Sequence, residues 1–133
     1  TGVTVISFMR EGAPAGMTVN AFMSVSLSPP LGLVSVRRES SFNDHVRVGS
    51  RYGVNILAED QQHLGSEFSA PFRPDREVAF SMHEGTPLLE NSLAHLLARV
   101  VDIRLAGDHL LHLAEVESFM LGKEAKPLIF CGS

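Results

Sequence analysis

The sequence contains no tryptophan, one tyrosine and one cysteine among its 133 residues. Because a single thiol, Cys131, can neither form an internal disulfide nor supply four metal ligands, disulfide scaffolds and zinc ribbons are excluded. This cysteine usage fits a reducing compartment, and we expect a cytoplasmic protein. We expect no metal site either, since His109 and His112 would face opposite sides of a predicted strand.

Positive charge is also in short supply. Lys and Arg number 11 against 15 Asp and Glu, giving a net charge of −4. No basic field is present to hold nucleic acid or an anionic membrane, so we expect neither as a partner. The first residues show no signal-peptide pattern. Residues 12–36 carry no charge, but Asn20, several serines and Pro29-Pro30 would leave polar groups unsatisfied in lipid, which excludes a membrane span.

The glycine motifs of common nucleotide and hydrolase sites are missing. No Gly-x-Gly-x-x-Gly follows a strand, and neither a Walker-type loop nor a Gly-x-Ser-x-Gly elbow is present. If the protein uses a dinucleotide, it does not bind it in a Rossmann domain. Hydrophobic residues make up 44% of the chain and charged residues 20%, which is close to the globular average. We therefore expect one domain over residues 1–133.

Alternation of period two dominates the chain and predicts β-strands. The predicted strands cover residues 1–8, 18–28, 31–36, 52–58, 78–83, 93–105 and 109–121, with a last short strand near Phe130. Turns are expected at 10–14 and 106–108 and loops at 70–76 and 84–87, and Pro29-Pro30 ends the second strand. Short helices are predicted at 42–48 and at 59–69, and in the second of these Leu64 and Phe68 would share one face. With no βαβ alternation, this order favours a small antiparallel barrel or sandwich.

The predicted strand over residues 18–28 has one face that is polar but uncharged. Its apolar residues, expected to point toward the core, are Val19, Ala21, Met23, Val25 and Leu27. The opposite face carries Thr18, Asn20, Phe22, Ser24 and Ser26. A solvated face usually carries Lys and Glu. Two explanations stay open: a subunit interface or loop covers this face, or it binds the polar edge of a heterocycle.

The segment Arg37-Arg38-Glu39-Ser40-Ser41 precedes the predicted helix at 42–48. Two guanidiniums and two hydroxyls near a helix N-terminus favour an anion such as phosphate. The alternative is a helix cap beside a solvated charge cluster. A phosphate site one strand away from a planar-ring site is what a phosphorylated cofactor requires. His109, at the mouth of the 106–108 turn, is either a ligand contact or a surface histidine.

Several segments, in order along the chain, carry a resemblance. They are TGVTV (1–5), GMTVNAF (16–22), SVSLSPPL (24–31), YGVNILA (52–58), PLLE (87–90) and AGDH (106–109) followed by Glu115-Val116. Together they resemble the flavin reductase domain family, the small reductase components of two-component flavin monooxygenases. That family usually has a helix before Thr1 and an aromatic, basic segment after Gly132, and we expect this domain to lack both.

The resemblance implies a mainly β fold, an antiparallel, Greek-key-like split β-barrel with two or more short helices, that forms a homodimer. It also implies an NAD(P)H-dependent flavin reductase that transfers hydride from NADH or NADPH to FMN or FAD and supplies a separate monooxygenase. No catalytic side chain is expected, because positioning of the two rings suffices. The alternatives are a flavoprotein with tightly held FMN that acts on another acceptor, and a non-enzymatic flavin-binding dimer.

The resemblance also implies which residues form the site. Thr18, Asn20, Ala21 and Ser24 would line the flavin ring, Val36 and Arg37 would lie near the ring and the ribityl chain, and Val19 and Phe22 would also contact the cofactor. Ser40, Ser41 and Phe42 would hold the phosphate, Phe68 and Ser69 would close over the flavin, and His109 would lie near the nicotinamide. Thr18, Asn20 or main-chain amides are expected to donate hydrogen bonds toward the pyrimidine edge of the ring, where charge accumulates on reduction.

Overall fold

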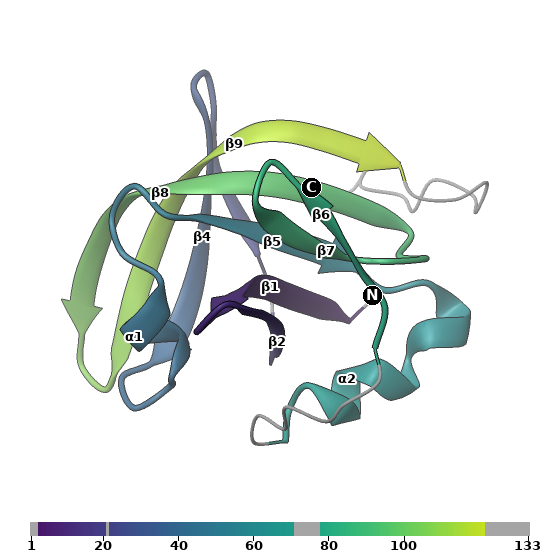
Figure 1. Ribbon diagram of the computed structural model, residues 1–133. Helices are drawn as coiled ribbons and strands as arrows, with labels where there is room; N and C mark the ends of the chain where they lie inside the picture. The colour runs from purple at the N-terminus through teal and green to yellow at the C-terminus, as the bar shows by residue number, and fades with distance from the viewer. Residues whose placement is uncertain (1–2, 21, 71–77, 122–133) are drawn as a thin grey trace.

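The computed structural model describes residues 3–20, 22–70 and 78–121. Within them, seven strands form one antiparallel sheet in the order β2-β1-β5-β8-β9-β4-β3, and two form a separate hairpin, β6-β7. Figure 1 shows the long sheet curving round on itself, with α1 and α2 near its lower end. The strands are β1 (Thr4–Arg10), β2 (Ala13–Val19), β3 (Met23–Leu27), β4 (Pro30–Arg37), β5 (Arg51–Ile56), β6 (Phe80–His83), β7 (Thr86–Leu89), β8 (Ala94–Ala106) and β9 (His109–Leu121). The antiparallel, mainly β architecture is thus confirmed.

The hairpin of β8 and β9 agrees closely with its sequence prediction. Gly107 has a φ of 63°, a left-handed conformation that glycine adopts without a steric cost, so the turn forms where the alternation is interrupted. The register of the two strands shifts between Leu97 and Ala98 and again between Val100 and Asp102. Such bulges bend long strands and increase their twist. The hairpin can therefore follow the curve of the barrel over its whole length.

Two buried clusters lie on either side of β1. Ile6 and Phe8 belong to the main core, whereas Val5 packs in a second cluster with Leu57, Phe68 and Leu89. This explains why β1 is buried from Thr4 to Phe8, although an antiparallel strand commonly has one solvated face. The second cluster also contains Leu64. The prediction that Leu64 and Phe68 share a packed face is confirmed.

The prediction of one continuous strand over residues 18–28 is wrong. β2 ends at Val19 and β3 begins at Met23, and the two lie at opposite edges of the sheet. β2 pairs with β1, whereas β3 pairs with β4. The strand does end before Pro29-Pro30, as predicted: β3 stops at Leu27, and a turn with a cis Ser28-Pro29 bond leads into β4. Alternation is a local property and does not register a change of pairing partner.

The predicted burial along this segment is also corrected. Met23, Val25 and Leu27 were expected to face the core, but they are 58%, 50% and 88% exposed. Phe22, placed on the polar face by alternation, packs instead against the main core. Its ring lies where a side chain at Gly32 would otherwise stand. The break after β2 reverses the two faces of the chain, as a one-residue change of register does.

The helices are shorter than predicted. The helix expected at 42–48 is α1 (Phe42–His45), and the one at 59–69 divides into η1 (Glu59–Gln61) and α2 (His63–Glu67). β7 was not predicted, because Thr86 and Pro87 were assigned to a loop. Ala21, most of the loop at 70–76 and the strand near Phe130 lie outside the described residues. No helix in the described part of the chain is long and apolar enough to cross a membrane.

Candidate functional site

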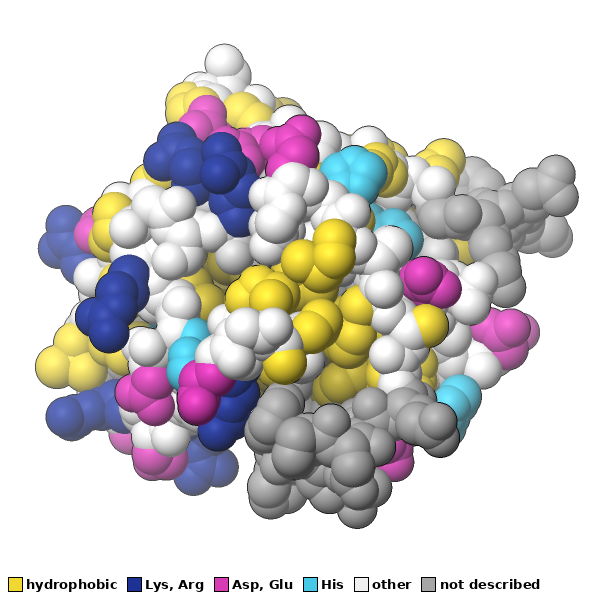
Figure 2. Space-filling view, viewed as in Figure 1, with side chains coloured by type: hydrophobic (Ala, Val, Ile, Leu, Met, Phe, Trp, Pro, Cys, Tyr) yellow, Lys and Arg dark blue, Asp and Glu magenta, His cyan; other side chains and the backbone are white. Residues whose placement is uncertain are grey.

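Two neighbouring hollows open beside the ends of β2 and β4. The first, here named the His109 hollow, has a volume of about 490 Å³ and is lined by Met17, Thr18, Val19, Asn20, Ser35, Val36, Arg37, Ser40, Asp108 and His109. The second, the Phe68 hollow, has about 450 Å³ and is lined by Phe8, Arg10, Ala15, Gly16, Met17, Arg37, Glu39, Ser40, Ser41, Phe42, Phe68, Ser69 and Ala70. Both volumes suit a small-molecule site. On the face viewed in Figure 2, hydrophobic side chains gather near the centre, with Lys and Arg to their left.

The fold brings together most residues that the sequence assigned to the site. The His109 hollow holds Thr18, Val19, Asn20, Val36, Arg37, Ser40 and His109. The Phe68 hollow holds Arg37, Ser40, Ser41, Phe42, Phe68 and Ser69. Phe22 and Ser24 line neither of these two hollows, because the chain has left the site by the start of β3. Ala21 lies outside the described residues.

Thr18 lines its hollow in a different chemical role from the one predicted. Its hydroxyl donates to the carbonyl of Gly65 at 2.7 Å, and its backbone N–H donates to the carbonyl of Phe68 at 3.2 Å. A hydroxyl has one hydrogen to donate. Both Thr18 donors are therefore engaged within the protein, and its side chain can offer a ligand only an acceptor. Asn20, which is exposed, remains the predicted donor on this strand.

His109 and Asp108 form a bonded pair at the edge of the His109 hollow. The two side chains meet at 2.9 Å between Nδ1 and Oδ1, and His109 lies opposite Arg37 across the β4–β9 ladder. Since an ionised carboxylate only accepts, Nδ1 carries the hydrogen. The bond from His109 holds the pKa of Asp108 below its usual range, and Arg37 adds a smaller electrostatic effect. The ring is thereby oriented with Nε2 away from the carboxylate.

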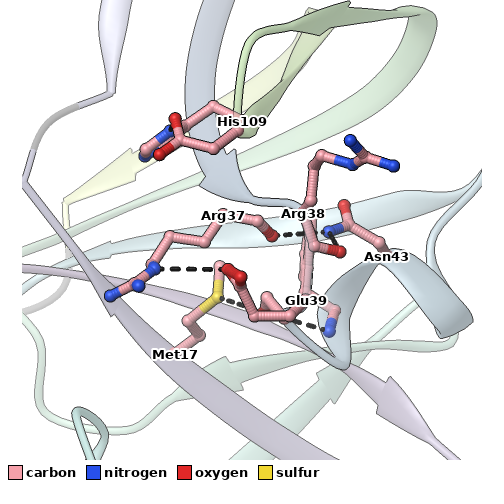
Figure 3. Close-up of polar contacts among 9 residues, drawn as sticks. Met17, Arg37, Arg38, Glu39, Asn43 and His109 are labelled. Carbon is pink, nitrogen blue, oxygen red and sulfur yellow. Dashed lines mark hydrogen bonds and ion pairs between the residues drawn. The ribbon is translucent and has the colours of Figure 1, made fainter.

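The segment Arg37–Ser41 contributes to both hollows, because Arg37 and Ser40 line each of them. Figure 3 shows the side chain of Asn43 beside the main chain of this segment, where Nδ2 donates to the carbonyls of Arg37 and Arg38 at 2.8 and 3.2 Å. The Ser40 hydroxyl contacts the Met17 sulfur at 3.3 Å. Because α1 has only four residues, the predicted contribution of a helix dipole to anion binding is small.

Sequence reasoning missed several residues that line the hollows. Arg10, at the end of β1, donates from Nη1 to the Ser41 hydroxyl at 3.3 Å, so a second guanidinium joins Arg37 beside the serines. Met17 lies between the two hollows, and Gly16 lets the Phe68 ring approach β2, since its nearest ring carbon would be 2.7 Å from an added Cβ. Of these, only Gly16 and Met17 lay inside a segment that carried the resemblance.

Comparison with known proteins identifies the class. The flavin reductase like domain model matches residues 1–133. An NADH-dependent flavin reductase from Rhodococcus sp. is 42% identical over 98% of this chain and 75% of its own length. HsaB of Rhodococcus jostii, the reductase subunit of a flavin-dependent monooxygenase, is 32% identical over 98% of this chain and 68% of its own. The solved flavin reductase PheA2 superposes with a TM-score of 0.82 at 39% identity, over 92% of this chain and 80% of that one.

The chain therefore belongs to the flavin reductase like domain family, and the fold is that family's split β-barrel. Flavin reductases are oxidoreductases, and the predictions of fold class, enzyme class and family are confirmed. The residues present fit a phosphorylated flavin. Apolar side chains such as Val36 and Met17 suit a planar ring, the Asn20 amide suits its polar edge, and hydroxyls with guanidiniums suit a phosphate.

Proposed function

We propose that this chain reduces FMN or FAD with a reduced nicotinamide and that the flavin lies across the two hollows. The observation that carries the proposal is that the hollows share Met17, Arg37 and Ser40. A ligand with a planar ring at one end and a phosphate at the other can therefore occupy both. The bound flavin would accept a hydride, which is chemistry that the cofactor itself supplies. The protein's contribution is to hold two rings in register.

The roles of individual residues follow from their chemistry. We assign the ring to the His109 hollow, with Val19 and Val36 against it and Asn20 donating to its pyrimidine edge. Ser35, also in that lining, is a further hydroxyl within this hollow. His109, oriented by Asp108, would contact the nicotinamide. These donors would favour the ring in its reduced, more negative form.

The phosphate is assigned to the Phe68 hollow, near the residues that this hollow shares with the His109 hollow. Ser40 and Ser41 present hydroxyls there, and the guanidiniums of Arg10 and Arg37 supply positive charge. Arg37 is bonded to Glu39 at 3.3 Å in an exposed pair, and such pairs are weak enough for a phosphate to compete. Phe42 contributes chiefly its backbone, because its side chain is buried in the main core. Phe68 and Ser69 would cover the bound flavin.

We further propose that two copies of the chain associate through β3. This strand is at the edge of the sheet, and it exposes Met23, Val25 and Leu27. Exposed apolar edge strands favour pairing with another chain, and closed two-fold dimers are the commonest soluble assembly. Light scattering after gel filtration should give a dimer for the wild type and a monomer for Leu27→Lys. A wild-type monomer at micromolar concentration would contradict the proposal.

By analogy with HsaB, the reduced flavin would serve a separate oxygenase. The cytoplasmic location and the choice of NADH or NADPH stay predictions. The decisive experiment follows oxidation of NADH and NADPH by absorbance, with FMN, FAD or no added flavin. Turnover that rises and saturates with free flavin is expected. Flavin retained through gel filtration without such saturation would favour a prosthetic flavin with another acceptor, and binding without turnover would favour a non-enzymatic flavin protein.

A further inference from the structure

His112 is a fully buried histidine on β9. It lies three residues beyond His109 on the other face of the strand, where its ring packs edge-on against Phe42 with 4.9 Å between ring centroids. Burying a polar ring in an apolar core costs free energy unless the ring is hydrogen-bonded. Its Nε2 meets the side-chain oxygen of Asn43 at 2.8 Å, and its buried Nδ1 has no hydrogen-bond partner among the described residues. The histidine therefore makes its hydrogen bond with the side chain of Asn43.

The bonding partners of Asn43 fix the direction of this contact. Its Nδ2 donates to the carbonyls of Arg37 and Arg38, which can only accept, so the amide cannot be turned round without losing both bonds. Its Oδ1 must then face His112, and Nε2 of His112 must carry the hydrogen. The hydrogen bonds are all donated in one direction. His112 donates to Asn43, and Asn43 donates to two consecutive carbonyls at the start of the Arg37–Ser41 segment.

These two peptide groups determine where the segment lies. The Arg37 carbonyl also accepts from the N–H of Ser40 at 3.0 Å, and the N–H of Arg38 donates to the carbonyl of Asp108 at 3.0 Å. The Asn43 amide thus fixes the first turn of the segment, from which Ser40 and Ser41 extend into the hollows. Loss of the amide contacts would free that turn while leaving the strands β4 and β9 paired.

We propose that His112, acting through Asn43, is a positioning residue that holds the Arg37–Ser41 segment in place to receive the flavin phosphate. The inference rests on the proposed function, because the ligand is the flavin of that site. It assigns a role to a core histidine that touches neither hollow. It also predicts that replacing His112 or Asn43 lowers the affinity for the flavin phosphate and leaves the contacts with the flavin ring unchanged.

The test compares flavins with and without a phosphate. Dissociation constants for FMN and riboflavin are measured by fluorescence titration for wild type, His112→Leu, His112→Gln and Asn43→Ala. Leucine is close to histidine in volume but cannot donate, whereas glutamine can. We expect His112→Leu and Asn43→Ala to raise the Kd for FMN about tenfold and the Kd for riboflavin less than about twofold, with His112→Gln near wild type. Asp44→Ala, an exposed change in the same helix, is the matched control.

An equal change for FMN and riboflavin, or no change for either, would overturn the inference. Asn43 is only partly buried, so its variant answers the question even where a substitution of His112 fails to fold. Hydrogen exchange at the Arg38 and Ser40 amides, measured without flavin, is the second readout, and faster exchange is expected in Asn43→Ala. Unchanged exchange would also overturn the inference. A wild type that binds neither flavin would instead overturn the proposed function, and the exchange result would still decide whether Asn43 holds the segment.

Discussion

The hydroxyl of Thr18 donates a 2.7 Å hydrogen bond to the carbonyl of Gly65 and so joins β2 to α2. The same carbonyl accepts from the hydroxyl of Ser69 at 2.8 Å. Phe68, between these residues, also bonds through its carbonyl to the N–H of Thr18. One threonine therefore fixes the end of the helix that carries Phe68 and Ser69 into the candidate flavin site.

Replacing Thr18 by valine keeps the shape of the side chain and removes the hydroxyl. We expect Thr18→Val to lower the free energy of unfolding by about 1 kcal/mol, as the loss of one partly buried hydrogen bond does. Urea denaturation measures this, and Thr18→Ser, which retains the donor, should recover most of the stability. Equal stability of all three proteins would mean that the bond contributes nothing.

The close approach of Gly16 and Phe68 gives a second prediction. An added Cβ at Gly16 would lie 2.7 Å from the Phe68 ring, and that ring is 4% exposed. Gly16→Ala should therefore cost about 1–3 kcal/mol through overpacking. Phe68→Leu in the same chain should relieve part of this cost, giving a coupling energy in a double-mutant cycle by thermal or chemical unfolding. Strictly additive effects would contradict the contact.

For His109 we expect an effect on one substrate only. His109→Ala should raise the KM for the reduced nicotinamide several-fold, while the Kd for flavin stays within about twofold. Steady-state kinetics at saturating flavin and a separate flavin titration distinguish the two. Asp108→Asn should show the same pattern more weakly, because it disturbs the orientation of the ring without removing it. An unchanged KM in His109→Ala would remove His109 from the nicotinamide site.

Asn20 is the remaining side-chain donor predicted for the polar edge of the flavin ring. Asn20→Ala should weaken binding of FMN and riboflavin alike and slow flavin reduction, since the ring is common to both ligands. Stopped-flow absorbance gives the rate of reduction at saturating nicotinamide. Because Asn20 is exposed, little change in stability is expected. A variant that binds and reduces flavin as well as the wild type would exclude this role.

Burial lowers the pKa of His112 to about 4, whereas an unfolded histidine titrates near 6.5. Above about pH 6.5 both states hold the neutral ring, so His112 adds no pH dependence there. Between pH 6.5 and about 4 the unfolded state binds the extra proton, and stability should fall with decreasing pH by up to about 1.4 kcal/mol per unit. Urea titrations across this range should show a flatter profile for His112→Leu. Parallel stability profiles for wild type and His112→Leu would contradict a lowered pKa of His112 as the cause of this pH dependence.

The sequence alone was sufficient to predict structure wherever the interactions that determine it are local. Alternation and the Gly107-Asp108 turn specify the β8–β9 hairpin, because both strands and their turn are contiguous. Low cysteine content excluded disulfide scaffolds and zinc ribbons, and the lack of excess positive charge argued against a nucleic-acid-binding protein. The segments that resemble flavin reductases were enough for family membership, and they contain Thr18, Asn20 and His109 among the residues that line the two hollows. In each case the information lies in a short stretch of chain.

Tertiary structure alone decided which strands are neighbours and which faces are buried. β2 and β3 alternate without interruption in sequence, yet pairing with β1 and β4 sends them to opposite edges and exposes Met23, Val25 and Leu27. Arg10 reaches Ser41, and His112 reaches Asn43, only because the curved sheet brings distant segments together. A side-chain pattern fixes the period of a strand, but partners far apart in sequence are chosen by the burial and hydrogen bonding of the whole domain.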